Sequence, residues 1–178
     1  MKALLSGRLP LPALLTGSLL IAGCALPKAD GKKAPGDAAS QVRLGDRCFY
    51  GTWLAGSDPE KAVAWYRKAA QQGDARGLTR LGLCYAYGDG VAKNHAEALA
   101  LFRKAAEQGD SEAQYRLGRC YAKGDWLPKN PILAYKWLNL AAGSGNEPAK
   151  EERDDLAWNM SASQIAKAQR LSLEWKPQ

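Results

Sequence analysis

Histidine is almost absent from this chain: its 178 residues include one, His95, along with only two phenylalanines and two methionines. One histidine excludes a metal site built from several imidazoles, and no CxxC pair or Cys/His cluster suggests zinc. The GDG stretch at residues 88–90 falls at a predicted turn, not in a phosphate loop. No β-strand pattern and no aromatic–basic nucleic-acid motif is present. We therefore expect no metal, cofactor or nucleic-acid partner, and we predict that the protein is not an enzyme.

What the chain has instead is an internal repeat. Residues 75–110 and 111–146 are two copies of one pattern in strict register. The period is 36, as the distances from Leu81 to Leu117 and from Tyr85 to Tyr121 show. A fixed period of this size predicts stacked supersecondary units.

Each copy is predicted to be a helical hairpin. The apolar residues in the first half of a copy follow the spacing of one helix face, and Gly88 stands where a left-handed C-cap is needed. Asn94 is predicted to be the N-cap of the second helix, with Glu97 closing a capping box. Asn130 begins the corresponding helix of the next copy.

Two further segments flank these copies. A degenerate repeat precedes them, in which Asp58 takes the place of Asn94 as a cap. A segment outside the register follows them, as expected of a capping element, and Ser161 with Gln164 predicts the start of its last helix. The expected fold is all-α: an α/α solenoid of about three hairpins with a C-terminal helical cap. The predicted boundaries are 40–74, 75–110 and 111–146 for the hairpins and 147–178 for the cap.

The repeats resemble the Sel1-like repeat, one of the tetratricopeptide-like α/α solenoids. The pattern that carries the resemblance is LG-x-x-Y-x-x-G-x-G, then an Asn or Asp cap, then AA-x-x-G. In the second hairpin this pattern is Leu81-Gly82, Tyr85, Gly88, Gly90, Asn94 and Ala105-Ala106-x-x-Gly109. The third hairpin departs from it at Trp126, where Gly90 stood, so a different inter-helix loop is expected there.

An export signal is predicted at the N-terminus. Residues 1–23 combine a basic start, Lys2 and Arg8, with an apolar stretch that is too short to span a membrane. The segment ends in Leu-Ile-Ala-Gly before Cys24, which resembles the bacterial lipobox. The resemblance implies cleavage before Cys24 and lipidation of that cysteine. An ordinary signal peptide, or an apolar N-terminus with a chance cysteine, is the alternative.

Lipidation would determine where the protein is located. Two or more acyl chains on Cys24 would anchor it stably in a membrane. Ala25 stands where an Asp retains such proteins at the inner membrane of enteric-type bacteria, and it therefore implies the outer membrane, facing the periplasm. Residues 24–39 are expected to be a flexible tether. Without Lys2 and Arg8 the formal net charge falls from +7 to about +5, a mildly basic value that selects no partner.

The other three cysteines are expected to be mostly buried thiols. Cys84 and Cys120 occupy the same repeat position, which places them about 10 Å apart at usual helix-packing distances. A disulfide requires Cα atoms within about 7 Å. Cys48 lies one register step off, so a Cys48–Cys84 bridge remains an alternative. His95 is predicted to lie at the surface, with no thiol beside it.

Cationic residues recur at one repeat position. Arg43, Arg80 and Arg116 each precede a Leu-Gly pair, and the first helices of successive hairpins usually line the concave side of such a solenoid. A row of arginines there can bind carboxylates of a partner; the alternative is that they pair with neighbouring Asp and Glu. With two aromatics expected to be exposed at the turns, the candidate protein-binding residues are Arg43, Arg76, Arg80, Arg116, Arg119, Lys123, Tyr87 and Trp126.

The resemblance implies a membrane-anchored adaptor or scaffold that binds another protein in the bacterial cell envelope. A binder of an envelope polymer, either peptidoglycan or an acidic polysaccharide, is the alternative. A β-lactam-interacting, hydrolase-like protein is less favoured, because the paired cysteines of such relatives are missing here. The sequence does not identify the partner.

Overall fold

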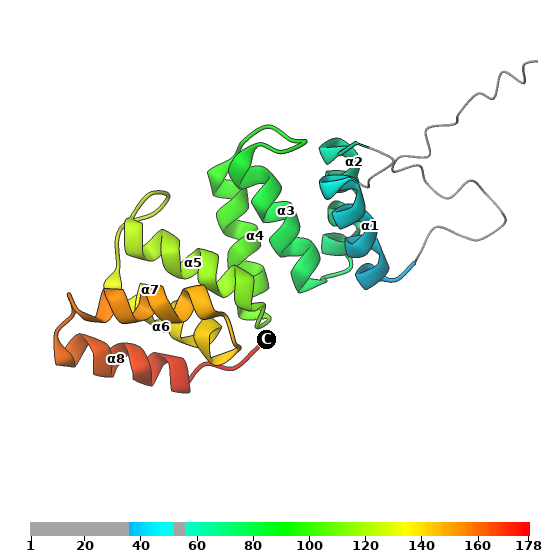
Figure 1. The fold of residues 1–178 in the computed structure, drawn as a ribbon. Helices are drawn as coiled ribbons and strands as arrows, with labels where there is room; N and C mark the ends of the chain where they lie inside the picture. The colour runs from blue at the N-terminus through cyan, green and yellow to red at the C-terminus, as the bar shows by residue number, and fades with distance from the viewer. Residues whose placement is uncertain (1–35, 52–55) are drawn as a thin grey trace, which may run out of the picture.

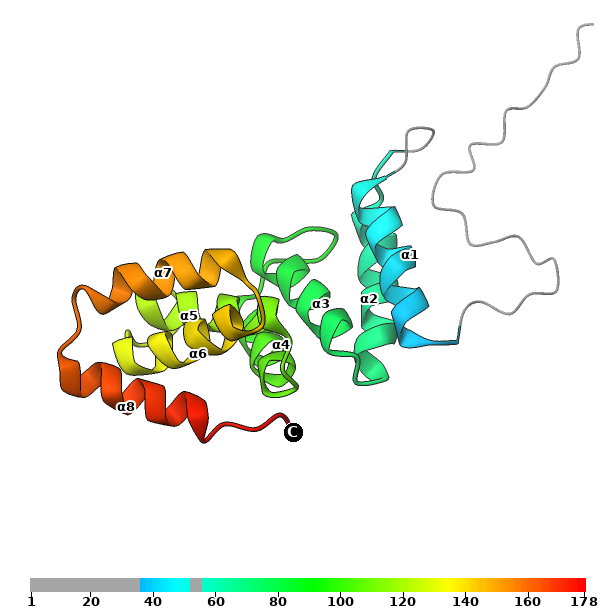
Figure 2. The same ribbon diagram turned by 60° about the horizontal axis from the view of Figure 1, so that its bottom comes forward.

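The computed structural model describes residues 36–51 and 56–178, which form eight α-helices and no β-strand (Figure 1). Their bounds are α1 Ala38–Tyr50, α2 Pro59–Gln71, α3 Ala75–Tyr87, α4 His95–Glu107, α5 Ser111–Lys123, α6 Pro131–Gly143, α7 Glu147–Ala157 and α8 Ala162–Leu173. Helices α1–α2, α3–α4 and α5–α6 are three hairpins stacked side by side, which confirms the predicted all-α solenoid (Figures 1 and 2). Within these residues no helix is long and apolar enough to cross a membrane.

Short polar caps and glycines set the helix ends, as the local sequence predicts. The Asn94 side chain accepts the backbone N–H of Glu97 and begins α4. Gly88 ends α3 with φ of +85°, the left-handed conformation that glycine adopts most readily. Ser161 and Gln164 form the predicted capping box at α8. At α4 the described contacts include only the asparagine half of the predicted box.

Helix α1 begins two residues earlier than the sequence analysis placed it. The Asp37 carboxylate accepts the backbone N–H of Ser40 at 2.8 Å and caps the helix. Ala38 and Ala39, which were expected in the tether, therefore form its first turn. The predictions for residues 1–35, including lipidation of Cys24, lie outside the described residues.

The Leu-Gly pair of the repeat is a packing requirement. Gly82 of α3 lies against Phe102 of α4, and Gly118 of α5 lies against Leu138 of α6. A Cβ at either glycine would come within 2.7 Å of the Phe102 ring or 2.8 Å of the Leu138 side chain. Phe102 and Leu138 are almost fully buried. Only glycine therefore lets the two helices of a hairpin approach this closely.

Only the first helix of the C-terminal segment extends the stack. Helix α7 continues it against α6, but α8 turns back and packs along α6 (Figure 2). Beyond α8, Trp175 lies edge-on to Trp137 with ring centroids 6.4 Å apart. The N–H of Gln178 then donates to the carbonyl of Glu107 at the end of α4. The end of the chain thus returns to the second hairpin.

Candidate partner-binding groove

The first helices of the hairpins line a continuous groove made of three adjoining hollows. The first hollow lies between α1 and α3, and the second lies one repeat further, between α3 and α5. Leu83, Tyr87 and Arg116 line both of them. The third hollow lies nearer the starts of these helices and shares Arg80 and Glu112 with the first. We refer to the three together as the groove.

Seven of the eight predicted binding residues line this groove. Five of them surround the second hollow: Tyr87, Arg116, Arg119, Lys123 and Trp126. Arg80 lines the first and third hollows, and Arg76 lines the third. Arg43 is the exception, since its guanidinium donates to Ser40 on its own helix and it lines none of the three. The repeat register thus brought most of the candidates onto one surface.

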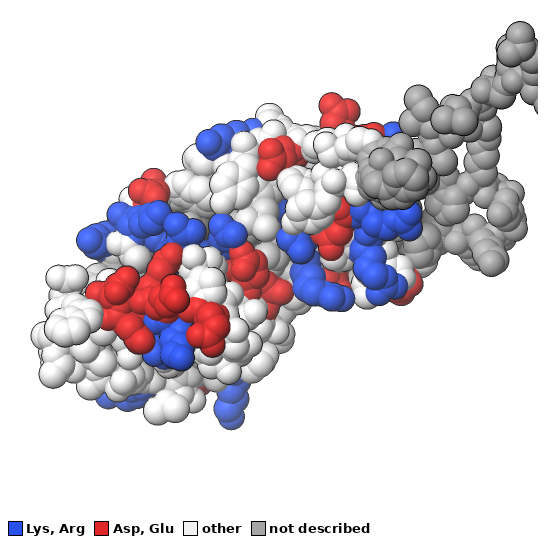
Figure 3. Space-filling view, in the orientation of Figure 1, with Lys and Arg blue, Asp and Glu red and all other residues white. Residues whose placement is uncertain are grey.

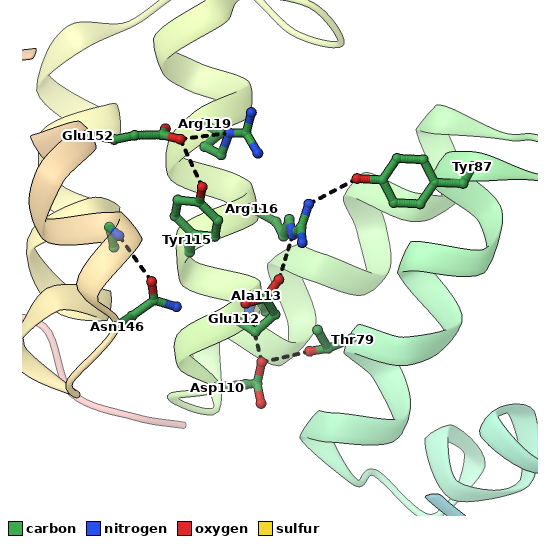
Figure 4. Close-up of polar contacts among 11 residues, drawn as sticks. Thr79, Tyr87, Asp110, Glu112, Ala113, Tyr115, Arg116, Arg119, Asn146 and Glu152 are labelled. Atoms are coloured by element: carbon green, nitrogen blue, oxygen red, sulfur yellow. Dashed lines mark hydrogen bonds and ion pairs between the residues drawn. The ribbon is translucent and has the colours of Figure 1, made fainter. Parts of the chain in front are cut away.

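Two of the arginines pair with carboxylates on other helices of the stack. Arg80 Nε lies 3.1 Å from Oδ1 of Asp46 on α1, which also accepts a 2.8 Å hydrogen bond from the Tyr66 hydroxyl. Arg119 Nε lies 3.2 Å from Oε1 of Glu152 on α7 (Figure 4). The predicted basic row is therefore largely a row of ion pairs, in agreement with the alternative interpretation. Such pairing reduces the positive field that the row presents to a distant polyanion.

Arg116 connects two of the hairpins. Its Nε lies 2.6 Å from Glu112, and its Nη1 donates to the Tyr87 hydroxyl on α3 at 3.0 Å (Figure 4). A guanidinium has five N–H donors, so donors remain for a bound molecule. The two contacts hold the guanidinium in place before any partner arrives, which lowers the entropic cost of binding.

Charges of both signs surround the groove. Figure 3 shows carboxylates gathered over α7, with lysine and arginine side chains beside them over α5. The acidic residues of α7 are Glu147, Glu151, Glu152, Asp154 and Asp155. The surface is therefore not uniformly basic, despite the net charge of +7 of the whole chain.

The second hollow combines apolar walls with a polar rim. Leu83, Ala86, Phe102 and Trp126 contribute apolar surface to a space of about 160 Å³. Lys123 stands exposed at the rim and forms no ion pair within residues 36–51 and 56–178. The hollow therefore offers an apolar cavity beside Lys123, and the exposed carboxylate of Asp125 also lines it.

Trp126 forms one wall of the second hollow, and it stands at a position where the second and third hairpins have different residues. In the second hairpin the equivalent residue is Gly90, at φ +69°, where a Cβ would collide with the backbone of Pro59. In the third hairpin the Trp126 indole instead stacks on His95, with ring centroids 4.4 Å apart, and faces Phe102 at 6.5 Å. Two expectations are wrong here, because this stacking leaves both Trp126 and His95 half-buried rather than exposed.

Cys84 and Cys120 are buried free thiols, so the alternative Cys48–Cys84 bridge is not formed. Burial raises the pKa of both thiols to about 11. At pH 8 only about one thiol in a thousand would be ionised, and the thiolate is the nucleophile. Nor does any group of His, Cys, Asp and Glu in the described part of the chain have a metal-binding arrangement.

We expect both thiols to resist alkylation in the folded protein. Iodoacetamide at pH 8 should modify Cys84 and Cys120 at least about a hundredfold more slowly than after unfolding in urea, because burial and the raised pKa act together. Peptide mass mapping at timed intervals measures this. Rapid labelling of Cys120 would show that the wall of the second hollow opens in solution.

Sequence reasoning missed the apolar lining, and it did not identify which carboxylates pair with the arginines. For Leu83 the sequence did contain a signal, because the equivalent residues in the other hairpins are charged. They are Asp46 in the first hairpin and Arg119 in the third. An apolar residue at a position that is otherwise charged indicates a contact that the solenoid itself does not require. Glu152 carried no such signal, because it lies within a charged run of α7.

Comparison with known proteins gives a consistent result. A protein-family model described as the Sel1 repeat matches residues 38–74, 75–110 and 111–146. A protective antigen of uropathogenic Escherichia coli displaying an SLR fold is 34% identical, with a TM-score of 0.70 over 79% of this chain and 30% of that chain. A Sel1 repeat protein from Oxalobacter formigenes is also 34% identical, with a TM-score of 0.63 over 72% and 51% of the two chains. This chain thus spans about 30% of the first of these structures and 51% of the second, and the comparison with curated proteins found no match.

Proposed function

Because the chain belongs to the Sel1 repeat family, whose members are generally adaptors for protein–protein interaction, we propose that it is a non-enzymatic adaptor lipoprotein of the bacterial cell envelope. The groove is the observation that carries the proposal. It gathers seven candidate binding residues on helices that are held rigidly by packed hairpins. A partner protein would lie along α1, α3 and α5, the helices that line it.

The groove favours a protein over an anionic polymer. Peptidoglycan or an acidic polysaccharide would bind mainly through cations, yet Arg80, Arg116 and Arg119 each already have a carboxylate beside them. A protein can fill the apolar second hollow as well as contact its rim, and apolar burial is the main source of affinity in most protein–protein association. The polymer remains the alternative in the experiment below.

Site-specific photocrosslinking in living cells tests the adaptor proposal. Benzoylphenylalanine in place of Tyr87 places an aromatic crosslinker in the groove without removing an arginine from an ion pair. Tyr87 is 60% exposed and lies between the first and second hollows. We expect a discrete, protease-sensitive adduct after irradiation, which gel electrophoresis and mass spectrometry would detect and identify.

Trp158 provides the matched control. It is also an aromatic residue, it is 88% exposed, and it stands at the end of α7 away from the groove. The same crosslinker there should give no adduct of the same mass. Equal adducts at both positions, or none at Tyr87, would count against the groove as a protein-binding surface, and a protease-resistant smear at Tyr87 alone would favour the polymer.

The envelope location depends on Cys24. Replacing Cys24 with serine should abolish incorporation of radiolabelled palmitate and shift the protein from the membrane fraction to the soluble fraction or to an uncleaved precursor, because the acylated residue would be missing. Fractionation and the mass of the mature N-terminus measure this.

Ala25→Asp is the companion variant for the choice of membrane. It should keep the lipid and move the protein from the outer to the inner membrane in a density gradient. Palmitate incorporation that persists in Cys24→Ser would refute the anchor, and an unchanged gradient position in Ala25→Asp would refute the outer-membrane assignment.

A further inference from the structure

We propose that the second hollow binds a bulky apolar side chain of an extended partner segment, whose neighbouring acidic residue pairs with Lys123. This inference rests on the proposed adaptor function and specifies the chemistry that its partner must present. It concerns one of the hollows, so it can fail while the adaptor function stands.

The shape and lining of the hollow favour a side chain over a flat surface. Four apolar residues, Leu83, Ala86, Phe102 and Trp126, surround a space of about 160 Å³, which is on the scale of one large side chain. The neighbouring Cys120 thiol stays neutral because burial raises its pKa to about 11. An apolar anchor therefore meets a neutral thiol beside the apolar wall, while the exposed Lys123 and Asp125 also line the hollow.

The charges at the edge of the hollow favour an acidic residue next to the apolar anchor in the partner segment. Arg116 and Arg119 are neutralised by Glu112 and Glu152, whereas Lys123 forms no ion pair within the described chain. Asp125, which also lines the hollow, forms none there either, so Lys123 is the cation that remains for a carboxylate of the partner. An ammonium at the mouth of an apolar cavity favours an opposite charge next to the buried group. The carboxylate of the partner would thus add to the contact without disturbing the pairs already made.

Arg116 is the reason that we expect the partner segment to bind in an extended conformation. Its guanidinium is fixed by Glu112 and Tyr87, and its remaining N–H groups can donate to backbone carbonyl oxygens. Helical backbone carbonyls are already bonded within the helix, whereas those of an extended segment are available. The held arginine therefore discriminates in favour of an extended strand of the partner.

The comparison of repeats explains why one hollow differs from the other. In the second hairpin, Tyr87 and Gly90 stand at the positions that Lys123 and Trp126 occupy in the third. The first hollow is lined by Tyr87 and therefore has neither the indole wall nor the unpaired ammonium. A partner segment with one such pair of apolar and acidic residues would then bind with its apolar residue in the second hollow and not in the first.

Selection from a random peptide library tests the inference. The full chain, solubilised in detergent, would be panned against displayed random 12-residue peptides, and enriched peptides would be labelled for binding by fluorescence anisotropy. We expect enrichment of Leu, Ile, Phe or Trp adjacent to Asp or Glu. Trp126→Gly, which gives the third hairpin the residue of the second, should weaken binding at least tenfold, and Trp126→Phe should retain most of it.

Lys123→Glu separates the charge from the cavity. It should weaken the acidic peptide about tenfold and leave the same peptide with Gln in place of its acid nearly unaffected. Circular dichroism of each variant confirms folding. Absence of an apolar–acidic motif, or full binding to Trp126→Gly, would overturn the inference; so would a preference for acidic residues alone, which would indicate polyanion binding. A crosslinked protein at Tyr87 together with any of these results would leave the adaptor function intact.

Discussion

Gly90→Ala should lower the melting temperature by about 10 °C. Gly90 has φ of +69° and lies against the backbone of Pro59 and Glu60, with the Glu60 nitrogen 2.7 Å from the position of an added Cβ. The left-handed conformation costs an alanine roughly 1–2 kcal/mol, and overpacking adds about 1–3 kcal/mol. Backbone atoms cannot rotate away as a side chain can. A total of about 2–5 kcal/mol corresponds to a shift of about 10 °C for a domain of this size, which circular dichroism would measure.

Gly145→Ala is the control that separates strain from collision. Gly145 also has a positive φ, of +84°, but no atom lies within 4 Å of the place that an added Cβ would take. We expect it to cost only the conformational term, about 1–2 kcal/mol. Equal melting temperatures for the two variants would mean that the loop after α3 moves away from α2 at little cost.

Phe102→Ala should have an even larger effect, about 3–5 kcal/mol of unfolding free energy. The ring is 1% exposed, fills the space left by Gly82 between α3 and α4, and supports Trp126 from beneath. Its removal leaves a cavity at the centre of the second hairpin. Urea unfolding followed by circular dichroism measures the loss, which would be a large fraction of the roughly 5–15 kcal/mol typical of a domain.

Phe102→Leu is the matched variant. Leucine fills the same position in the third hairpin, as Leu138, where it packs against Gly118. We therefore expect a cost of about 1 kcal/mol, because most of the volume is kept. If the alanine variant were no less stable than the leucine variant, the space beside Gly82 would have to collapse without penalty, contrary to the tight packing described above.

Local rules made most of the fold predictable. The helix ends follow from nearby sequence, because each cap bonds or shapes the backbone within a few residues of itself. Examples are Gly88 at the end of α3, Asn94 at the start of α4 and Ser161 at the start of α8. The return of α8 along α6 was not predictable in this way. It rests on contacts between distant residues, such as the hydrogen bonds from Gln169 to Tyr135 and from Ser172 to the Lys136 carbonyl, and no local pattern specifies them.

The sequence predicted where the groove lies, but it did not predict which of its charged residues are paired. A shared repeat position was enough to place Arg80 and Arg116 on one surface. Arg80 is neutralised by Asp46, which lies on a different helix. This pairing could not be predicted from the sequence, because it depends on how the two helices pack. Trp126 was expected to be exposed for the same reason: its burial comes from His95, on the second hairpin rather than its own.

The return of the C-terminus bears on how the protein unfolds. In a linear repeat array each unit touches only its neighbours, and the ends fray independently. Here Gln178 bonds Glu107, 71 residues earlier, so the chain from α4 to α8 closes into a loop. Separating the third hairpin from the second then requires the closing contact to break first. The end of the array formed by α4 to α8 is therefore closed, and we expect it to open as a unit in amide hydrogen exchange.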